Sequence, residues 1–113
     1  MEPKRKTIFL DRDGTINVDT GAGCDVGDWT FVEGAIEALR ILRREGFALS
    51  VVTNQAAVAD GRTSRERVAA VHVHMLRELE NVDVQIDAIS YCPHRSDAGC
   101  TCRKPRPGML GII

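Results

Sequence analysis

The stretch TIFLDRDGT, residues 7–15, joins a short apolar run to two carboxylates and a glycine. Residues 7–10 have the length and composition of a buried strand, and the polar, glycine-rich residues 11–28 predict a loop. Because residues at i and i+2 of an extended segment face the same side, Asp11 and Asp13 can address one ligand. The stretch therefore predicts a strand that ends at a pair of carboxylates, although an isolated Asp-x-Asp-Gly is also a common solvated turn.

Two helical patterns and two apolar runs alternate along the rest of the chain. Residues 32–44 carry apolar side chains at helical spacing, and the run 47–52 predicts a second strand buried on both faces. A capping box at 63–66 predicts the start of a second helix, and the apolar alternation over 84–91 predicts a third strand. This order predicts right-handed crossovers and a parallel sheet, hence an α/β fold whose ligands bind beyond the carboxyl ends of the strands.

The second predicted helix carries two histidines, His72 and His74. Because positions i and i+2 do not share a helix face, the pair is a poor candidate for one metal site. We expect both side chains to be solvated or half-buried.

The composition narrows the class of protein. The 113 residues carry a formal net charge of -1, with 43% hydrophobic and 27% charged residues, which predicts one soluble domain, 1–113. The balanced charge argues against a nucleic-acid partner bound through bulk charge. No apolar run approaches the ~20 residues of a membrane span, and the run after Lys6 is too short for a signal peptide. We expect a cytoplasmic monomer with neither membrane nor nucleic-acid partners.

Three motifs occur in a fixed order: FLDRDGTIN at 9–17, TNQ at 53–55 and CRKPRPGM at 102–109. Together they resemble the haloacid dehalogenase superfamily of phosphatases. Within it the likeness is to the heptose-bisphosphate phosphatases, and the related histidinol-phosphate phosphatases share much of the pattern. The resemblance implies a Rossmann-like, three-layer fold with a parallel sheet and no cap domain.

The resemblance also implies roles for the two carboxylates. Asp11 would attack phosphorus and form an aspartyl phosphate, and Asp13 would act as general acid and then as general base. Both would also ligate Mg²⁺, because paired carboxylates suit a hard cation. The implied substrate is a small sugar phosphate.

Four further residues follow from the second and third motifs. The resemblance implies that Thr53 and Asn54 bind the phosphate, and that Lys104 balances the charge on Asp11 and the phosphoryl group. Arg103 would hold a remote polar or phosphate group of the substrate, for which a guanidinium fork is suited. Read without the resemblance, Thr53 and Asn54 are a strand-ending turn, and Arg103 and Lys104 are exposed basic residues.

Two close pairs of residues have the types and spacing of zinc ligands: Cys92, His94, Cys100 and Cys102. Such a set fits tetrahedral Zn²⁺, whereas cysteines one residue apart make poor mutual disulfides and no exported context is visible. The resembling family has the same cluster, and there the zinc is structural. We predict a zinc-binding loop, 92–102, that fixes the entry of Arg103 and Lys104 into the phosphate site.

The resemblance implies Mg²⁺-dependent hydrolysis of a phosphomonoester, with the 7-phosphate of a D-glycero-D-manno-heptose 1,7-bisphosphate as the favoured target. Histidinol phosphate is the alternative substrate. The family pattern continues beyond Met109 to a fourth, acidic motif that this sequence does not contain. We therefore expect the C-terminal part of the family fold to be missing, and the second alternative is a catalytically impaired, zinc-stabilised fragment.

Overall fold

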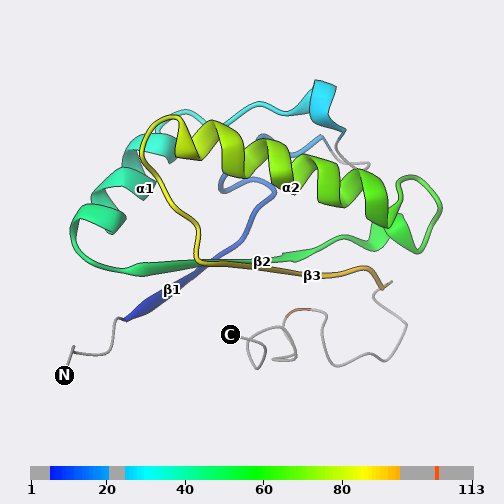
Figure 1. The fold of residues 1–113 in the computed structure, drawn as a ribbon. Coiled ribbons are helices and arrows are strands. Elements are labelled where there is room, and N and C mark those ends of the chain that lie inside the picture. The colour runs from blue at the N-terminus through cyan, green and yellow to red at the C-terminus, as the bar shows by residue number, and fades with distance from the viewer. Residues whose placement is uncertain (1–5, 21–24, 95–103, 105–113) are drawn as a thin grey trace.

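Strands and helices alternate along the chain, as the sequence predicts (Figure 1). The computed structural model describes residues 6–20, 25–94 and 104. Two short 3₁₀ helices, which no sequence pattern indicated, precede the α-helices. In chain order the elements are β1 (Thr7–Leu10), η1 (Val26–Asp28), α1 (Ala35–Arg44), β2 (Ala48–Asn54), η2 (Ala56–Val58), α2 (Arg65–Glu80) and β3 (Ala88–Cys92).

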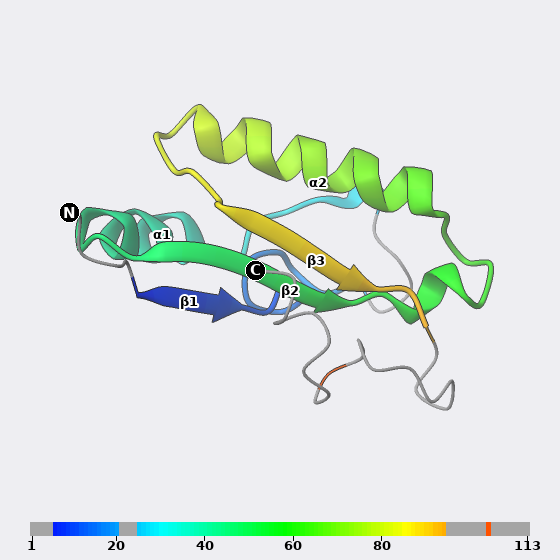
Figure 2. The ribbon, with the colours of Figure 1, turned by 60° about the horizontal axis from the view of Figure 1, so that its bottom comes forward.

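The three strands form a parallel sheet in the order β1-β2-β3. The register pairs Ile8 with Leu49 on one side of β2, and Val51 with Ile89 on the other. Because all three strands run in the same direction, their carboxyl ends meet at one end of the sheet (Figure 2). The interior of β2 is buried on both faces, which confirms the prediction for this strand.

Both α-helices lie over the same face of the sheet, where their apolar sides meet β2 (Figure 1). The buried core comprises Ile16, Leu39, Leu49, Val51, Met75, Leu79, Val84 and Ile86. The α/β class and the parallel sheet are therefore confirmed. Residues 6–20, 25–94 and 104 build the sheet and one helical layer, and they do not form the second helical layer of a three-layer fold. None of the helices in these ranges combines the length and apolarity that crossing a bilayer requires.

The helices begin later than the sequence predicted. α1 starts at Ala35 instead of residue 32, because Gly34 adopts a left-handed conformation (φ 83°) at the N-cap. Val32 instead donates its N–H to the carbonyl of Ile16 (2.9 Å) and ties this segment to the loop after β1. For α2 the capping residue is Ser64, not Thr63, because the Ser64 hydroxyl accepts the N–H of Arg67 (3.2 Å).

The second and third strands also differ from prediction at their ends. β2 continues through Asn54, so Thr53 and Asn54 belong to the strand and not to the following loop. β3 begins at Ala88 instead of residue 84, because Asp83 makes a left-handed turn (φ 62°) after α2. Val84 reaches the core from this turn, where its N–H binds the carbonyl of Leu79 (2.8 Å).

Candidate active site

The carboxyl ends of the strands carry most of the polar residues that the sequence singled out. Asp11 and Asp13 follow β1, Thr53 and Asn54 end β2, and Cys92 ends β3. Lys104 contacts both the β1 and the β2 groups. The structure therefore brings together residues that are up to 93 positions apart in the sequence.

The two carboxylate oxygens of Asp11 differ in their hydrogen bonds. Its Oδ1 accepts hydrogen bonds from Lys104 Nζ (2.7 Å) and from the backbone N–H of Arg12 (2.9 Å). Among the described residues, none donates a hydrogen bond to Oδ2. The side chain is 51% exposed. Asp11 is therefore held in one orientation by two donors and still has an oxygen accessible to a ligand.

Lys104 is anchored by four contacts to three residues at the ends of the first two strands. Besides its ion pair with Asp11, Nζ donates to the carbonyl of Val52 (2.9 Å). Its backbone N–H donates to Asn54 Oδ1 (3.0 Å), and Asn54 Nδ2 approaches the Lys104 carbonyl at 3.5 Å. The Asn54 side chain thus faces the main chain of Lys104, and it positions the ammonium group over Asp11.

Asp13 accepts four hydrogen bonds through its two oxygens. Oδ1 binds Arg12 Nε (3.1 Å), Arg12 Nη2 (2.8 Å) and Asn17 Nδ2 (3.0 Å), and Oδ2 binds Gln55 Nε2 (3.0 Å). Burial raises the pKa of this carboxyl, but the charge of Arg12 and the hydrogen bonds from Arg12, Asn17 and Gln55 outweigh it. The pKa of Asp13 therefore lies below its ordinary value, and the free site holds it as a carboxylate.

Arg12, the residue between the two carboxylates, is buried with only 1% of its surface exposed. Its guanidinium lies over the ring of Trp29 at 5.9 Å, within the range of a cation–π contact. While Nε and Nη2 bind Asp13, Nη1 lies 3.1 Å from Nε2 of His72. This group links the loop after β1 to the helix α2.

His72 contradicts the expectation of a solvated or half-buried side chain, because it is 8% exposed and hydrogen-bonded to Arg12. Arginine can only donate, so Nε2 of His72 must accept and the proton of the neutral ring sits on Nδ1. Burial, followed by the charge of Arg12, lowers the pKa of His72 to about 4. His74, in contrast, is half-buried as expected.

Thr53 and Gln55 connect β2 to Asp13. Gln55 Nε2 donates both to Asp13 Oδ2 and to Thr53 Oγ1, each at 3.0 Å. Since the Thr53 oxygen accepts, its own proton is available for another acceptor. Gln55 is placed by its backbone N–H, which binds the carbonyl of Cys92 at the end of β3 (2.7 Å).

Four residues of this site were missed by sequence reasoning: Arg12, Asn17, Gln55 and His72. Gln55 follows directly on Thr53 and Asn54, and Asn17 lies one helical turn after Asp13, so both had a positional signal. Asn17 reaches Asp13 because the turn after β1 wraps around the carbonyl of Arg12, which accepts the N–H of Asn17 (3.2 Å). His72 had no local signal, because its partner is 60 positions away.

The predicted zinc ligands are partly described. Cys92 Sγ and His94 Nδ1 lie 3.4 Å apart, close to the ~3.6 Å that separates a thiolate and an imidazole nitrogen on one tetrahedral zinc ion. Cys100, Cys102 and Arg103 lie outside the described residues. Within residues 6–20, 25–94 and 104, no three His, Cys, Asp or Glu side chains converge as a metal site. The donor types of Cys92 and His94 nevertheless fit zinc.

The two aspartates have the oxygen donors that Mg²⁺ prefers. Asp11 Oδ2 accepts no hydrogen bond from the described residues, and Asp13 Oδ2 accepts one, from Gln55. Both oxygens therefore retain lone pairs for a cation. The remaining oxygen of each residue is held by a cationic side chain, Lys104 on Asp11 and Arg12 on Asp13.

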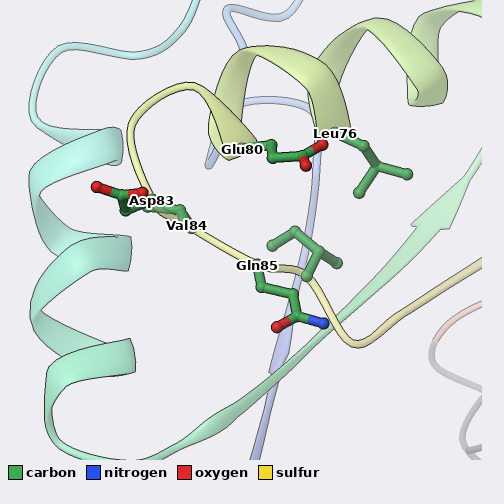
Figure 3. A pocket seen from close by; sticks show the side chains of 6 residues that line it. Leu76, Glu80, Asp83, Val84 and Gln85 are labelled. Atoms are coloured by element: carbon green, nitrogen blue, oxygen red, sulfur yellow. The ribbon is translucent and has the colours of Figure 1, made fainter.

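A cavity of about 550 Å³ lies elsewhere, beside the end of α2 and the turn before β3 (Figure 3). Its lining residues are Leu76, Glu80, Asp83, Val84, Gln85 and Ile86. The cavity is at the amino end of β3, whereas the aspartates lie at the carboxyl ends of the strands. It is therefore separate from the candidate active site.

The buried neutral His72 predicts a pH-dependent stability. Its pKa is about 4 in the folded chain against an ordinary 6.5, so between these values the unfolded chain binds a proton that the folded chain does not. The free energy of unfolding should fall as the pH drops from 6.5 to 4, by on the order of 3 kcal/mol from this group. Urea denaturation across this range measures the loss. His72→Gln should lose less stability than the wild type over the same window, and parallel curves would contradict the prediction.

The chain is similar to known phosphatases. A family model described as polynucleotide kinase 3 phosphatase matches residues 6–113. D-glycero-beta-D-manno-heptose-1,7-bisphosphate 7-phosphatase of Escherichia coli (strain K12) is 44% identical over 110 residues, which are 91% of this chain and 58% of that relative. The protein of the same name from Haemophilus influenzae is 42% identical over 111 residues, 93% of this chain and 60% of the relative.

A solved structure resembles the chain over nearly its whole length. It is D,D-heptose 1,7-bisphosphate phosphatase from B. bronchiseptica, complexed with magnesium and phosphate, with a TM-score of 0.88 and 38% identity. The match covers 96% of this chain and 61% of that one. The chain thus spans about three fifths of the length of the relatives that it matches.

Proposed function

The chain belongs to the polynucleotide kinase 3 phosphatase family, a family of the haloacid dehalogenase type, and from that premise we propose that it is a phosphomonoesterase. The proposed substrate is a heptose 1,7-bisphosphate, which loses its 7-phosphate through an aspartyl phosphate. One observation carries the proposal: Asp11 is held through Oδ1 by Lys104 and the Arg12 backbone, and none of the residues that the structure describes donates a hydrogen bond to its Oδ2 at the strand ends.

In the first step an Asp11 oxygen attacks the phosphorus of the substrate. The bond from phosphorus to the sugar oxygen breaks, and the Asp13 carboxyl gives its proton to that oxygen. Asp13 is a carboxylate in the free site, so it takes up this proton from solvent as the substrate binds. The negative phosphate favours the protonated form, because a like charge disfavours the carboxylate. Lys104 offsets the charge that collects on the transferring group and on Asp11.

In the second step water hydrolyses the aspartyl phosphate. Asp13, now a carboxylate, takes a proton from the water as its oxygen attacks phosphorus. The bond between phosphorus and the Asp11 oxygen breaks, which releases inorganic phosphate and restores Asp11 and Asp13 for another cycle. The lowered pKa of Asp13 in the free site favours its carboxylate form, which is the form that can accept a proton.

Substrate binding is assigned to four side chains. Thr53 has a hydroxyl proton available for a phosphate oxygen, and Asn54 acts at the same strand end by holding Lys104 in place. Arg103, by its position next to Lys104 in the sequence, is proposed to bind a remote phosphate or polar group. Asp11 and Asp13 would hold Mg²⁺, which when bound neutralises charge on the phosphoryl oxygens.

We also propose a structural zinc site. Cys92, His94, Cys100 and Cys102 would bind one Zn²⁺ in a structural role, because four protein ligands leave no open position for water. Zinc in the loop 92–102 would fix the chain just before Lys104. Support comes from the 3.4 Å approach of Cys92 Sγ to His94 Nδ1. We propose a single domain, 1–113, that acts as a monomer in the cytoplasm, with neither membrane nor nucleic-acid partners.

We propose heptose bisphosphate and not histidinol phosphate as the substrate, because the relatives described above are named for heptose bisphosphate. A second candidate is a catalytically impaired, zinc-stabilised fragment. It is favoured by one observation, that the chain spans 58% of the E. coli relative. The two candidates differ in whether the chain itself turns over phosphate.

A substrate panel tests the proposal. The 113-residue chain is assayed for phosphate release from heptose 1,7-bisphosphate and from histidinol phosphate, with Mg²⁺ and with excess EDTA. We expect a higher kcat/KM for heptose 1,7-bisphosphate than for histidinol phosphate. EDTA should abolish activity, and Mg²⁺ should restore it once the zinc that EDTA removed has been added back. Turnover of neither substrate with both metals present would favour the impaired fragment, and preference for histidinol phosphate would replace the substrate assignment.

A further inference from the structure

We infer that His72 is a positioning residue for Asp13, acting through the guanidinium of Arg12. The inference rests on the proposed function, in which Asp13 exchanges a proton with the substrate. His72 is not within the three motifs, and it belongs to a helix that supplies none of the proposed catalytic groups.

The geometry forms a continuous chain from α2 to the carboxylate. His72 Nε2 lies 3.1 Å from Arg12 Nη1, and the other two nitrogens of the same guanidinium bind Asp13 Oδ1 at 3.1 and 2.8 Å. The guanidinium is planar, so a turn of one edge moves the other edge as well. The contact with His72 therefore sets the angle at which Arg12 meets Asp13.

Burial makes the acceptor necessary. Arg12 is 1% exposed, so solvent cannot replace a lost partner of Nη1, and a buried donor without an acceptor is costly. The guanidinium carbon lies 5.9 Å from the centroid of the Trp29 ring, which packs on the same group. With His72 removed, Nη1 could find another acceptor only if the guanidinium moved.

The imidazole itself is held in place from two sides. Its ring packs edge-on against Tyr91 of β3 with 6.0 Å between centroids, and α2 carries its backbone. The neutral form that can accept is favoured, since burial and Arg12 lower the pKa of His72 to about 4. His72 thus presents a fixed lone pair to Arg12 in neutral solution.

The position of Asp13 can be read from its other donors. Asn17 Nδ2 and Gln55 Nε2 both bind this carboxylate, so their side-chain amide resonances report its place without an activity assay. We propose to compare wild type, His72→Gln, His72→Leu and Val71→Ala by NMR. Glutamine keeps an acceptor and leucine removes it. Val71→Ala perturbs the packing of the same helix at a buried position and keeps the His72 acceptor.

We expect His72→Leu to shift the Asn17 and Gln55 amide signals and to speed exchange of the Arg12 Nε proton with water. His72→Gln and Val71→Ala should resemble the wild type. The inference would be overturned if His72→Leu changed the amide signals and the exchange no more than Val71→Ala does. It would also be overturned if His72→Gln changed them as much as His72→Leu. If His72→Leu does not fold, the ¹⁵N shifts of His72 in the wild type show which ring nitrogen carries the proton. A proton on Nε2 at pH 7 would overturn the inference, because Nε2 could then not accept from Arg12.

Kinetics supplies the second readout. His72→Leu should lower kcat by roughly 10²-fold, as a small misplacement of a catalytic group does, with KM little changed because the substrate-binding residues are untouched. A loss confined to thermal stability, with kcat unchanged at low temperature, would mean a structural role and would refute the inference. A wild-type chain without phosphatase activity would remove the proposed function only, since the NMR comparison does not depend on turnover.

Discussion

Asp11→Asn should abolish phosphate release, with kcat lower by roughly 10⁴-fold or more, the scale on which loss of a nucleophile acts. The amide of asparagine does not form the aspartyl phosphate, and the substitution also removes the negative charge that holds Lys104 Nζ at 2.7 Å. Single-turnover measurements of phosphate release from heptose 1,7-bisphosphate, with acid trapping of phosphorylated protein, test both the rate and the intermediate.

The matched control for this experiment is Asp19→Asn, the same exchange at an exposed position of the loop that follows β1. It should leave kcat and trapped phosphoprotein close to the wild type. Turnover by Asp11→Asn that equals the control would refute Asp11 as the nucleophile. Loss of turnover with undiminished phosphoprotein would place the nucleophile elsewhere in the chain.

The second large effect is expected at the zinc site. Cys92→Ser removes one of four proposed ligands from a buried position at the end of β3. Because structural zinc contributes on the order of 10 kcal/mol to folding in small zinc domains, the variant should lose bound zinc and melt at a much lower temperature. Elemental analysis and thermal unfolding measure these two quantities.

Activity should fall with the zinc for a local reason. Lys104 meets Asp11, Val52 and Asn54 only if the chain after β3 returns to the first two strands. Cys24→Ser is the control, since Cys24 stands outside the proposed ligand set and the exchange is the same. Protein purified without chelator that contains no zinc, together with a disulfide among the four ligands, would contradict the assignment.

Local sequence patterns were sufficient for the order of the elements and for the two carboxylates. Each strand and helix was predicted from a pattern that spans only a few neighbouring residues, and the elements form in the predicted order. The positions at which the elements begin and end differ from the prediction. The start of α1 lies at Gly34, which adopts a left-handed conformation, while Val32 just before it bonds the loop after β1.

Contacts between distant residues had no comparable signal. Lys104 could be assigned to Asp11 only through resemblance, because 93 positions separate them. The hydrogen bond of Asn54 to the main chain of Lys104 had no signal in the sequence either. His72, expected to be at least half-exposed, is buried against Arg12. The packing of the strands and α2 brings each of these pairs into contact.

The sequence by itself determined that the chain alternates between strands and helices and that Asp11 and Asp13 follow the first strand. Those features arise from backbone preferences and apolar periodicity, which act over a few neighbouring residues. Only the tertiary structure decided that Asp13 is held by Arg12, Asn17 and Gln55, and that His72 supports Arg12 from α2. Side-chain partners of this kind depend on the parallel register and on burial, which exclude water and leave each polar group only the partners that packing brings within reach.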